Sequence, residues 1–406
     1  MVRDVLQPER KRKSSRVIGN IAKKKKSQSE QLGSLVARVV GVDFSGSSTD
    51  AGKLILVAEC KLFSERDAWT LVVDRVRSVN AMSGNVEKNP TEACKVLRAA
   101  LLGLKTECLN DVNAKPIQLI VGVDSPPSVA AQFISPLSWR DWAKTFSARY
   151  PAPEAFRTAT THIPPKALAA ESKPKLPSSS PSLKKVKKTP PVTRKFDSMA
   201  TAVELEPKRE TDILAKVPFA PQNLRMFRQT YHAIAGLYGP LVDEFTVVPC
   251  GLRELRGNSL TQVEKPLKLQ ECPAVVLKAC RENQALLFES CPASVLKRLG
   301  LYKPPYKSKG QKMDAAAHEA AFRRRQQLLK ILEKGVATTG TGNGVLKVVF
   351  PDVPLRHQLV DDAGADALDA VLAAVGAACA TRSPKFPSPS DGCWRDAYNV
   401  EACVYC

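Results

Sequence analysis

Three short apolar segments near the start of the chain limit its possible folds more than any other feature. They are residues 36–42 (VARVVGV), 54–61 (LILVAECK) and 69–76 (WTLVVDRV). Short segments rich in β-branched residues are typical of buried strands. The polar links between them are too short for the crossover helix that parallel neighbours need. The sequence therefore predicts that the fold begins with an antiparallel meander of three strands.

A helix and a fourth strand are predicted to follow the meander. Residues 90–105 (PTEACKVLRAALLGLK) carry leucines at helical spacing, with Thr91 as the expected N-cap. Residues 117–124 (IQLIVGVD) form another buried strand. Later predicted elements are helices over 223–239, 313–334 (with a basic face of Arg323, Arg324 and Arg325) and 361–380, strands over 245–248, 285–289 and 399–406, and a loop over 338–344. This mixture of strands and helices indicates an α/β fold.

The positive charge of the chain is concentrated in two segments. The formal net charge is +21 over 406 residues, yet residues 1–30 hold ten Lys/Arg against three acids, and residues 171–195 hold eight against one. Each segment therefore contributes +7, together 14 of the 21 charges. Neither segment can bury enough apolar surface to offset the entropy of ordering it. We expect a disordered basic tail over 1–33 and a folded domain over 34–406, interrupted by a disordered Pro/Ser/Lys insertion at 160–205.

The basic segments have alternative uses. The clusters Lys11-Arg12-Lys13 and Lys23-Lys24-Lys25-Lys26 have the spacing of a bipartite signal for a nuclear import receptor. A solvated tail with weak affinity for RNA is the alternative. The insertion is expected to be either a tether or a contact for nucleic acid or an acidic partner.

Composition also bears on the compartment. The eleven cysteines are odd in number, and no apolar signal segment precedes them. This pattern favours free thiols in a reducing compartment, so we expect a nuclear or cytoplasmic protein that is not secreted. No stretch approaches 18 uninterrupted apolar residues, and we therefore expect no transmembrane helix and no membrane partner.

Several aspartates are placed where the fold could bring them together. Asp43 and Asp124 each end an apolar strand, although a charge there commonly marks only the return to solvent. Asp362, Asp366 and Asp369 are spaced four and three residues apart, so on one continuous helix they share a face. The helix dipole accounts for one or two of these acids. Acids gathered from two strands and a late helix would instead suit a hard divalent cation, Mg²⁺ or Mn²⁺.

This order of elements and acids resembles the ribonuclease H-like fold. The local sequences resemble one branch of it, the predicted nuclease family catalogued as domain of unknown function 429. The pieces that carry the resemblance are Gly41-Val42-Asp43-Phe44-Ser45-Gly46, Ala51-Gly52-Lys53, Val121-Gly122-Val123-Asp124-Ser125-Pro126, Arg209-Glu210-Thr211-Asp212, Pro218-Phe219-Ala220-Pro221-Gln222-Asn223, Arg228-Gln229-Thr230, Glu289-Ser290-Cys291-Pro292-Ala293, Tyr306-Lys307 and Asp366-Ala367-Leu368-Asp369-Ala370. The resemblance implies a mixed α/β sheet with helices on both faces.

The same resemblance implies the residues of the site. The acids expected to bind metal and carry catalysis are Asp43, Asp124 and Asp366. Further acids able to reach the same metal are Asp362, Asp369 and Glu289. Residues expected to ring the site and contact phosphates, with surface ion pairs as the alternative, are Arg209, Asp212, Arg228 and Lys307.

The function expected from these residues is a metal-dependent nuclease. It would hydrolyse RNA or DNA by two-metal chemistry with Mg²⁺ or Mn²⁺. One alternative is a catalytically silent ribonuclease H-like module that binds nucleic acid or an acidic partner through its basic segments. Another is an enzyme that acts on a small phosphorylated substrate in place of a polymer.

Overall fold

The computed structural model describes most of the predicted domain. The described residues are 33–65, 68–110, 117–135, 137–161, 207–214, 217, 219–250, 272–308, 313–337 and 344–382. Four predictions lie wholly or almost wholly outside these residues, namely the basic tail, the insertion, the loop over 338–344 and the strand over 399–406.

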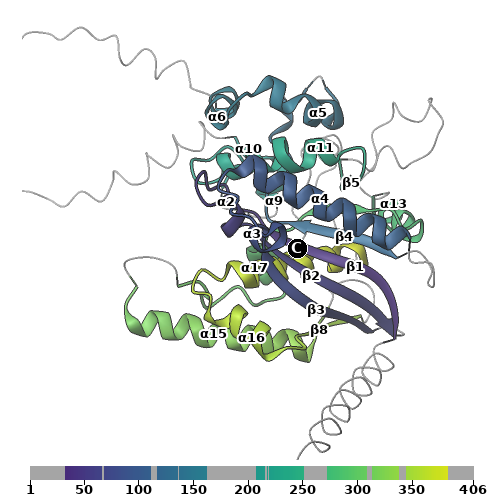
Figure 1. Ribbon diagram of the computed structural model, residues 1–406, viewed down its shortest axis with the longest axis vertical. Coiled ribbons are helices and arrows are strands. Elements are labelled where there is room, and N and C mark those ends of the chain that lie inside the picture. The colour runs from purple at the N-terminus through teal and green to yellow at the C-terminus, as the bar shows by residue number, and fades with distance from the viewer. Residues whose placement is uncertain are drawn as a thin grey trace, which may run out of the picture.

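The described residues form an α/β structure around one mixed sheet (Figure 1). Its eight strands lie in the order β5-β6-β4-β1-β2-β3-β8-β7. The strands are β1 (Ser34–Asp43), β2 (Leu56–Glu65), β3 (Ala68–Ser78), β4 (Gln118–Val123), β5 (Thr246–Val248), β6 (Leu286–Glu289), β7 (Val336–Ala337) and β8 (Val345–Val349).

The predicted three-stranded meander is confirmed. β1 pairs with β2, and β2 with β3, both antiparallel, so that Asp43 lies opposite Leu56. β4 lies on the other side of β1 and runs parallel to it, with Val42 opposite Val123. β6 continues parallel to β4, and β5 parallel to β6. The carboxyl ends of β1, β4 and β6 therefore meet at one end of the sheet.

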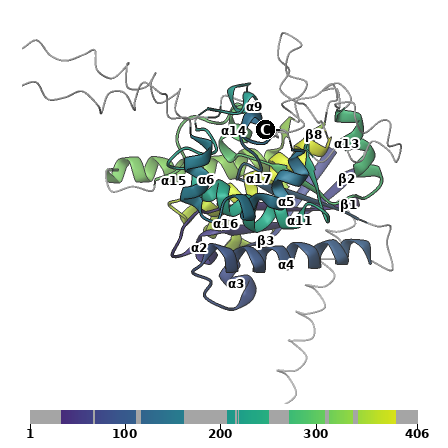
Figure 2. The same ribbon diagram turned by 90° about the horizontal axis from the view of Figure 1, so that it is seen from above.

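Helices cover both faces of this sheet (Figure 2). They are α2 (Ala51–Leu54), α3 (Val79–Ser83), α4 (Pro90–Leu109), the 3₁₀ turn η1 (Ala131–Phe133), α5 (Trp139–Arg149), α6 (Pro153–Thr160), α9 (Glu210–Leu214), α10 (Phe227–Ala233), the π-helical turn η2 (Ile234–Tyr238), α11 (Gly239–Leu241), α13 (Cys272–Arg281), α14 (Pro292–Arg298), α15 (Ala315–Lys334), α16 (Val353–Asp361) and α17 (Asp366–Arg382). Alternate strand residues face opposite sides. Val39 and Ile120 thus pack with α14, α15 and α17, whereas Val40 and Val121 pack with α4, α5 and α10.

Helix α17 approaches the sheet very closely, because two glycines face it. Gly41 of β1 and Gly122 of β4 lie opposite each other in the parallel register. A Cβ atom on Gly41 would lie 1.9 Å from the backbone oxygen of Ala370. One on Gly122 would lie 2.3 Å from the backbone oxygen of Ala373. The glycine pair and the alanine-rich helix therefore fix where the first turn of α17 lies above the strand ends.

The helix predicted over 361–380 is wrong at its start. α16 ends one residue into that range, and α17 begins only at Asp366. The carboxylate of Asp362, which lies between the two helices, accepts hydrogen bonds from the N–H groups of Gly364 and Ala367, both at 3.0 Å. Asp362 therefore satisfies N–H groups at the start of α17 in place of sharing a helical face with Asp366.

Other boundaries also differ from the predictions. α4 extends beyond residue 105, and its cap is Asn89, whose side chain accepts the N–H of Thr91 at 2.7 Å. The helix predicted over 223–239 is divided into α10, η2 and α11. β7 and β8 fall outside every predicted strand. β8 (VLKVV) is short and follows a glycine-rich segment, so its period-two signal is weak.

The basic face predicted for the helix over 313–334 is wrong for two of its three arginines. Arg323 is exposed and pairs with Glu319 at 2.6 Å. Arg324 and Arg325 are buried and donate hydrogen bonds to backbone carbonyls. A buried arginine is tolerated here because carbonyl oxygens accept hydrogen bonds from its guanidinium group.

No disulfide joins the cysteines of the described segments. Among the described residues, no single helix is long and apolar enough to cross a membrane, and α16 and α17 reach that length only as a pair bent by 109°.

Candidate metal centre

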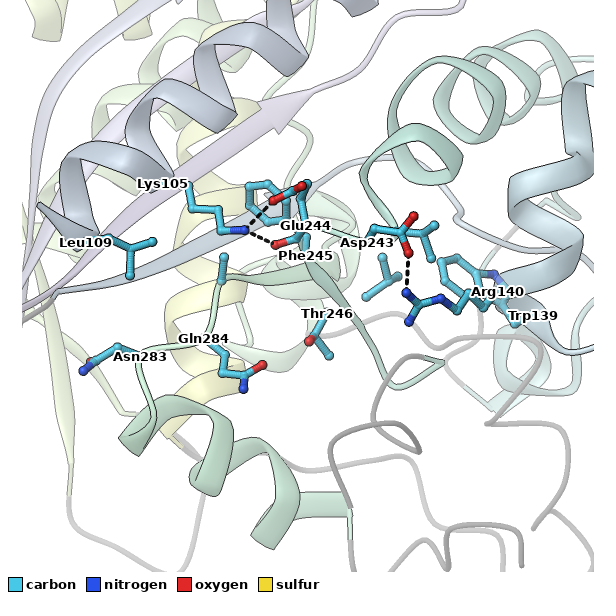
Figure 3. A pocket seen from close by; sticks show the side chains of 13 residues that line it. Lys105, Leu109, Trp139, Arg140, Asp243, Glu244, Phe245, Thr246, Asn283 and Gln284 are labelled. Carbon is cyan, nitrogen blue, oxygen red and sulfur yellow. Dashed lines mark hydrogen bonds and ion pairs between the residues drawn. The ribbon is translucent and has the colours of Figure 1, made fainter. Parts of the chain in front are cut away.

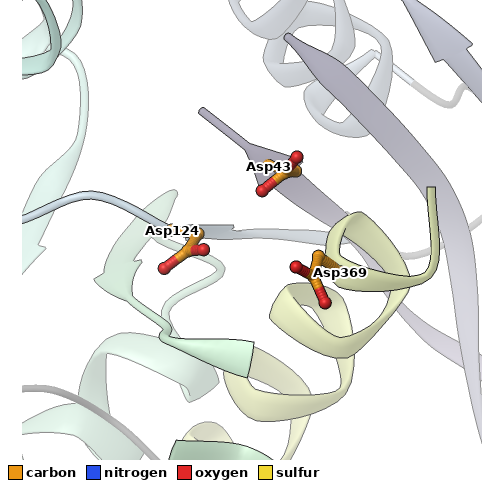
Figure 4. A group of neighbouring side chains, drawn as sticks. All are labelled: Asp43, Asp124 and Asp369. Atoms are coloured by element: carbon orange, nitrogen blue, oxygen red, sulfur yellow. The ribbon is translucent and has the colours of Figure 1, made fainter. Parts of the chain in front are cut away.

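Three aspartates converge where β1, β4 and α17 meet (Figure 4). Asp43 is the last residue of β1, Asp124 directly follows β4, and Asp369 lies in the first turn of α17. One carboxylate oxygen of each residue lies within 4.8 Å of the others. Asp369 is buried, whereas Asp43 and Asp124 are partly exposed. The cluster can therefore be reached from solvent on one side.

The period of a β-strand explains why these carboxylates face one another. Residues two apart share a face of the sheet, so Gly41 and Asp43 point the same way, as do Gly122 and Asp124. The glycines face α17, and the aspartates therefore point toward its first turn. The N–H of Asp124 donates to the carbonyl of Val42 at 2.8 Å, which keeps the two strand ends side by side.

Burial is the main cause that raises the pKa values of all three acids, and neighbouring carboxylates add to it. Burial, followed by the charges of Asp369 and Asp124, raises the pKa of Asp43 well above its ordinary value. Burial and the charge of Asp369 raise the pKa of Asp124 to about 8. Burial also raises the pKa of Asp369. Carboxylates held together in this way favour a bound cation, which stabilises their ionised form.

Lys307 and Tyr306 contact the buried member of the cluster. The ammonium group of Lys307 forms an ion pair with Asp369, and its side chain is half exposed. The hydroxyl of Tyr306 donates to Oδ1 of Asp369 at 2.7 Å. Burial lowers the pKa of Lys307, but the charges of Asp369 and then Asp43 and Asp124 outweigh it and raise that pKa overall. Lys307 is therefore held in its charged form beside the three carboxylates.

The other two predicted acids of the late helix, Asp362 and Asp366, are not members of this cluster. Asp366 lies outside the group of three, but it lines a cavity together with Asp43, and its charge contributes to the raised pKa values of Asp43 and Asp369. Asp362 is engaged in capping α17. The cluster thus contains Asp369 at the position for which the sequence analysis favoured Asp366.

Arg209, Asp212 and Glu289 form a separate buried ion cluster. Nε and Nη2 of Arg209 donate to the two oxygens of Asp212 at 2.9 and 2.6 Å. Nη1 and Nη2 donate to the two oxygens of Glu289, both at 2.7 Å. All three side chains are at most 5% exposed. Arg209 and Asp212 are therefore enclosed, contrary to the expectation that they ring the site and contact phosphates.

Register explains why Glu289 is not part of the aspartate cluster. It lies opposite Val123 in the pairing of β6 with β4, and Val123 packs on the face away from α17. Its charge still contributes to the raised pKa of Asp124, after burial and Asp369. Glu289 therefore acts on the site electrostatically while its carboxylate is bound to Arg209.

A cavity of about 400 Å³ opens beside Asp43. Its lining includes Asp366 and the basic residues Arg225 and Arg228. Arg228 pairs with Glu154 at 2.9 Å, and both side chains are more than half exposed. Exposed pairs of this kind are weak, so Arg228 can exchange its partner for a phosphate at little cost.

The chemistry of the aspartate cluster fits a hard divalent cation. Mg²⁺ and Mn²⁺ prefer carboxylate oxygens and keep several water ligands. Asp43, Asp124 and Asp369 supply oxygen ligands from three separate elements, with partial exposure on one side. A softer metal such as Zn²⁺ is usually bound by Cys or His, and neither residue type belongs to this group of ligands. The residues present could therefore hold Mg²⁺ or Mn²⁺.

A second pocket lies near the amino ends of β5 and β6, and none of the three clustered aspartates lines it (Figure 3). Its volume is about 360 Å³. Lys105 donates to the carboxylate of Glu244 at 2.7 Å, and Arg140 forms an ion pair with Asp243. Because these charges compensate one another within the pocket, it gives no comparable indication of a ligand.

Some residues that build the site carried no assigned role in the sequence analysis. Tyr306 belongs to one of the pieces that carry the resemblance, but its role follows only from its contact with Asp369. The glycines could have been found, because the triplet Gly-Val-Asp occurs at the end of both strands. Comparison of the chain with protein-family models, with curated proteins and with solved structures gave no match.

Proposed function

We propose that the chain is a metal-dependent nuclease of ribonuclease H-like architecture, which hydrolyses phosphodiester bonds of RNA or DNA. The observation that carries this proposal is the meeting of Asp43, Asp124 and Asp369 at one end of the sheet, with carboxylate oxygens within 4.8 Å. Three buried or half-buried acids without equal positive charge are costly for a fold to keep. A bound catalytic cation would compensate their negative charge.

The strand order supports the ribonuclease H-like part of the proposal. An antiparallel meander on one side of β1 and parallel strands on the other match the resemblance, as does a helix between β3 and β4. The family pattern has acids on strand one, at the end of strand four and on a late helix. Asp43, Asp124 and Asp369 correspond to these positions.

Asp43, Asp124 and Asp369 would hold the cation. Asp366, which lines a cavity together with Asp43, would help to hold a second cation. When bound, the ion would polarise the phosphate and lower the pKa of a bound water. Tyr306 fixes the orientation of the Asp369 carboxylate through its hydrogen bond.

Basic residues on two sides of the carboxylates can bind the substrate. Lys307 is half exposed and would contact a phosphate oxygen next to the scissile bond. Arg225 and Arg228 line the cavity on the Asp43 side and would hold a flanking phosphate. Contacts of this kind fix the position of the backbone without reading sequence.

The proposal is tested by a cleavage assay with the purified chain. End-labelled single strands, duplexes, RNA–DNA hybrids and branched DNA are incubated with Mg²⁺ or Mn²⁺. We expect cleavage that EDTA abolishes. Asp43→Asn should reduce the rate by more than the roughly 10–100-fold that loss of an outer-shell partner costs.

The matched control is Asp352→Asn, which removes an exposed carboxylate that makes no capping hydrogen bond. It should cleave at the wild-type rate. Cleavage that persists unchanged in Asp43→Asn would refute the assignment of the site. Metal binding without cleavage of any substrate would instead favour the alternative of a catalytically silent binding module.

A further inference from the structure

We propose that a cavity beside the carboxylates receives an unpaired base of the nucleic-acid strand. This inference rests on the proposed function and names the substrate class as single-stranded. The cavity has a volume of about 810 Å³. Its lining residues are Ala293, Tyr302, Lys303, Pro304, Pro305, Tyr306 and Lys307.

The cavity shares a wall with the metal centre. Tyr306 and Lys307 line it, and both residues also contact the carboxylate of Asp369. The cavity and the acidic cluster are therefore joined through these two residues. A nucleotide whose base enters the cavity would bring its phosphate close to Lys307.

The lining combines flat apolar surface with positive charge. Tyr302 is 43% exposed, and Nζ of Lys297 lies 5.1 Å from the centroid of its ring. Proline rings at 304 and 305 supply further apolar surface, and Lys303 supplies a second charge beside Lys307. No acidic residue is among the seven lining residues. A nucleotide joins a flat ring to an anion and so matches both properties, whereas an acidic peptide supplies the charge alone.

The wall of the cavity is held in place before any ligand binds. Nη2 of Arg324 donates to the carbonyls of Leu301 and Lys303 at 2.6 and 3.1 Å. Nη1 of Arg325 donates to the carbonyl of Tyr306 at 2.7 Å. Two buried arginines of α15 thus fix the backbone on both sides of the prolines. A preformed wall lowers the entropic cost of binding.

The shape of the nucleic acid decides which strands can use this cavity. In a duplex the bases are stacked and paired, and the backbone covers the outside. A base can reach the ring of Tyr302 only when it is unstacked, as in a single strand, loop or end. We therefore expect a preference for single strands over a blunt duplex of the same sequence.

The test measures binding of the full chain to a fluorescently labelled single strand and to the corresponding blunt duplex. EDTA is present, so that neither metal nor cleavage contributes. Tyr302→Ala should weaken single-strand binding by roughly 5- to 150-fold, the range of one stacked base. Tyr302→Phe, which keeps the ring, should bind like the wild type. Duplex binding should be unchanged in both variants.

Titrations at two salt concentrations separate stacking from attraction by the basic segments, because the latter falls steeply with salt. Equal affinity of wild type and Tyr302→Ala for the single strand would overturn the proposal. Equal losses of affinity for the single strand and the duplex in Tyr302→Ala would overturn it too, because Tyr302 would then act on the sugar-phosphate backbone and not on an unpaired base. If the chain has no nuclease activity, the binding result still stands. If the chain cleaves nucleic acid but Tyr302→Ala binds the single strand like the wild type, only the base-binding proposal fails.

Discussion

Replacing Arg209 with methionine is expected to lower the free energy of unfolding by about 3–5 kcal/mol, measured by urea denaturation. The substitution leaves the carboxylates of Asp212 and Glu289 buried without their cation. The energy of the intact cluster is smaller than this loss, because most of the effect is the cost of two unpaired buried charges.

Arg75→Met is the matched control for this substitution. Arg75 also binds a poorly exposed carboxylate, that of Glu59, at 2.6 Å. The Arg75 side chain is 53% exposed, and Arg77 remains bonded to Glu59 at 2.5 Å. We expect a loss of about 1 kcal/mol or less. Similar losses for the two variants would contradict the account of the buried cluster.

The effect of Arg209→Met should also depend on pH. Burial raises the pKa of Glu289, and Arg209 lowers it, so removing Arg209 lets the pKa rise further. A carboxyl group whose pKa is higher in the folded than in the unfolded state lowers the stability of the fold as the pH rises above the unfolded-state pKa. The difference in stability from the wild type should therefore shrink as the pH falls toward the ordinary pKa of a glutamate side chain. A constant gap would indicate lost packing instead.

Gly41→Ala is expected to disturb both the fold and the proposed metal centre. The added Cβ would lie 1.9 Å from the carbonyl oxygen of Ala370 and 2.5 Å from the nitrogen of Ala374, so α17 must move. Overpacking of this kind costs about 1–3 kcal/mol, and sometimes more. Asp369 precedes Ala370, so Mn²⁺ binding should weaken by about tenfold or more, as it does when ligand support is lost.

Gly103→Ala provides a control of opposite sign. Gly103 lies on the exposed side of α4, and a Cβ there has no neighbouring atom within 4 Å. Alanine is favoured over glycine in helix interiors by up to about 1 kcal/mol, so this variant should be slightly more stable. Full Mn²⁺ affinity in Gly41→Ala would contradict the role assigned to the glycine pair.

Much of the sheet could be predicted from the sequence, because its first four strands are local patterns. The β-branched runs that became β1 to β3 and the short links between them are enough to predict the meander. β7 and β8 could not be predicted in this way. β8 is a short strand with a lysine at its centre, and its pairing with β3 depends on residues far apart in the chain.

The candidate site could be predicted in part for a similar reason. Asp43 and Asp124 follow directly from strands that end in an acid. The choice between Asp366 and Asp369 depends on where a helix begins and how it rotates, and the break at Asp362 is set by capping hydrogen bonds. The enclosure of Arg209 depends on Glu289, which is 80 residues away in the chain, so no local pattern contains it.

The central claim is that Asp43, Asp124 and Asp369 hold a divalent cation, and calorimetric titration with Mn²⁺ tests it most directly. The wild type and Asp352→Asn should bind the ion alike, whereas Asn at any of the three positions should abolish or strongly weaken binding. Asp366→Asn should weaken it less than Asp369→Asn. Failure of the wild type to bind Mn²⁺, or unchanged binding in all three Asn variants, would contradict the account.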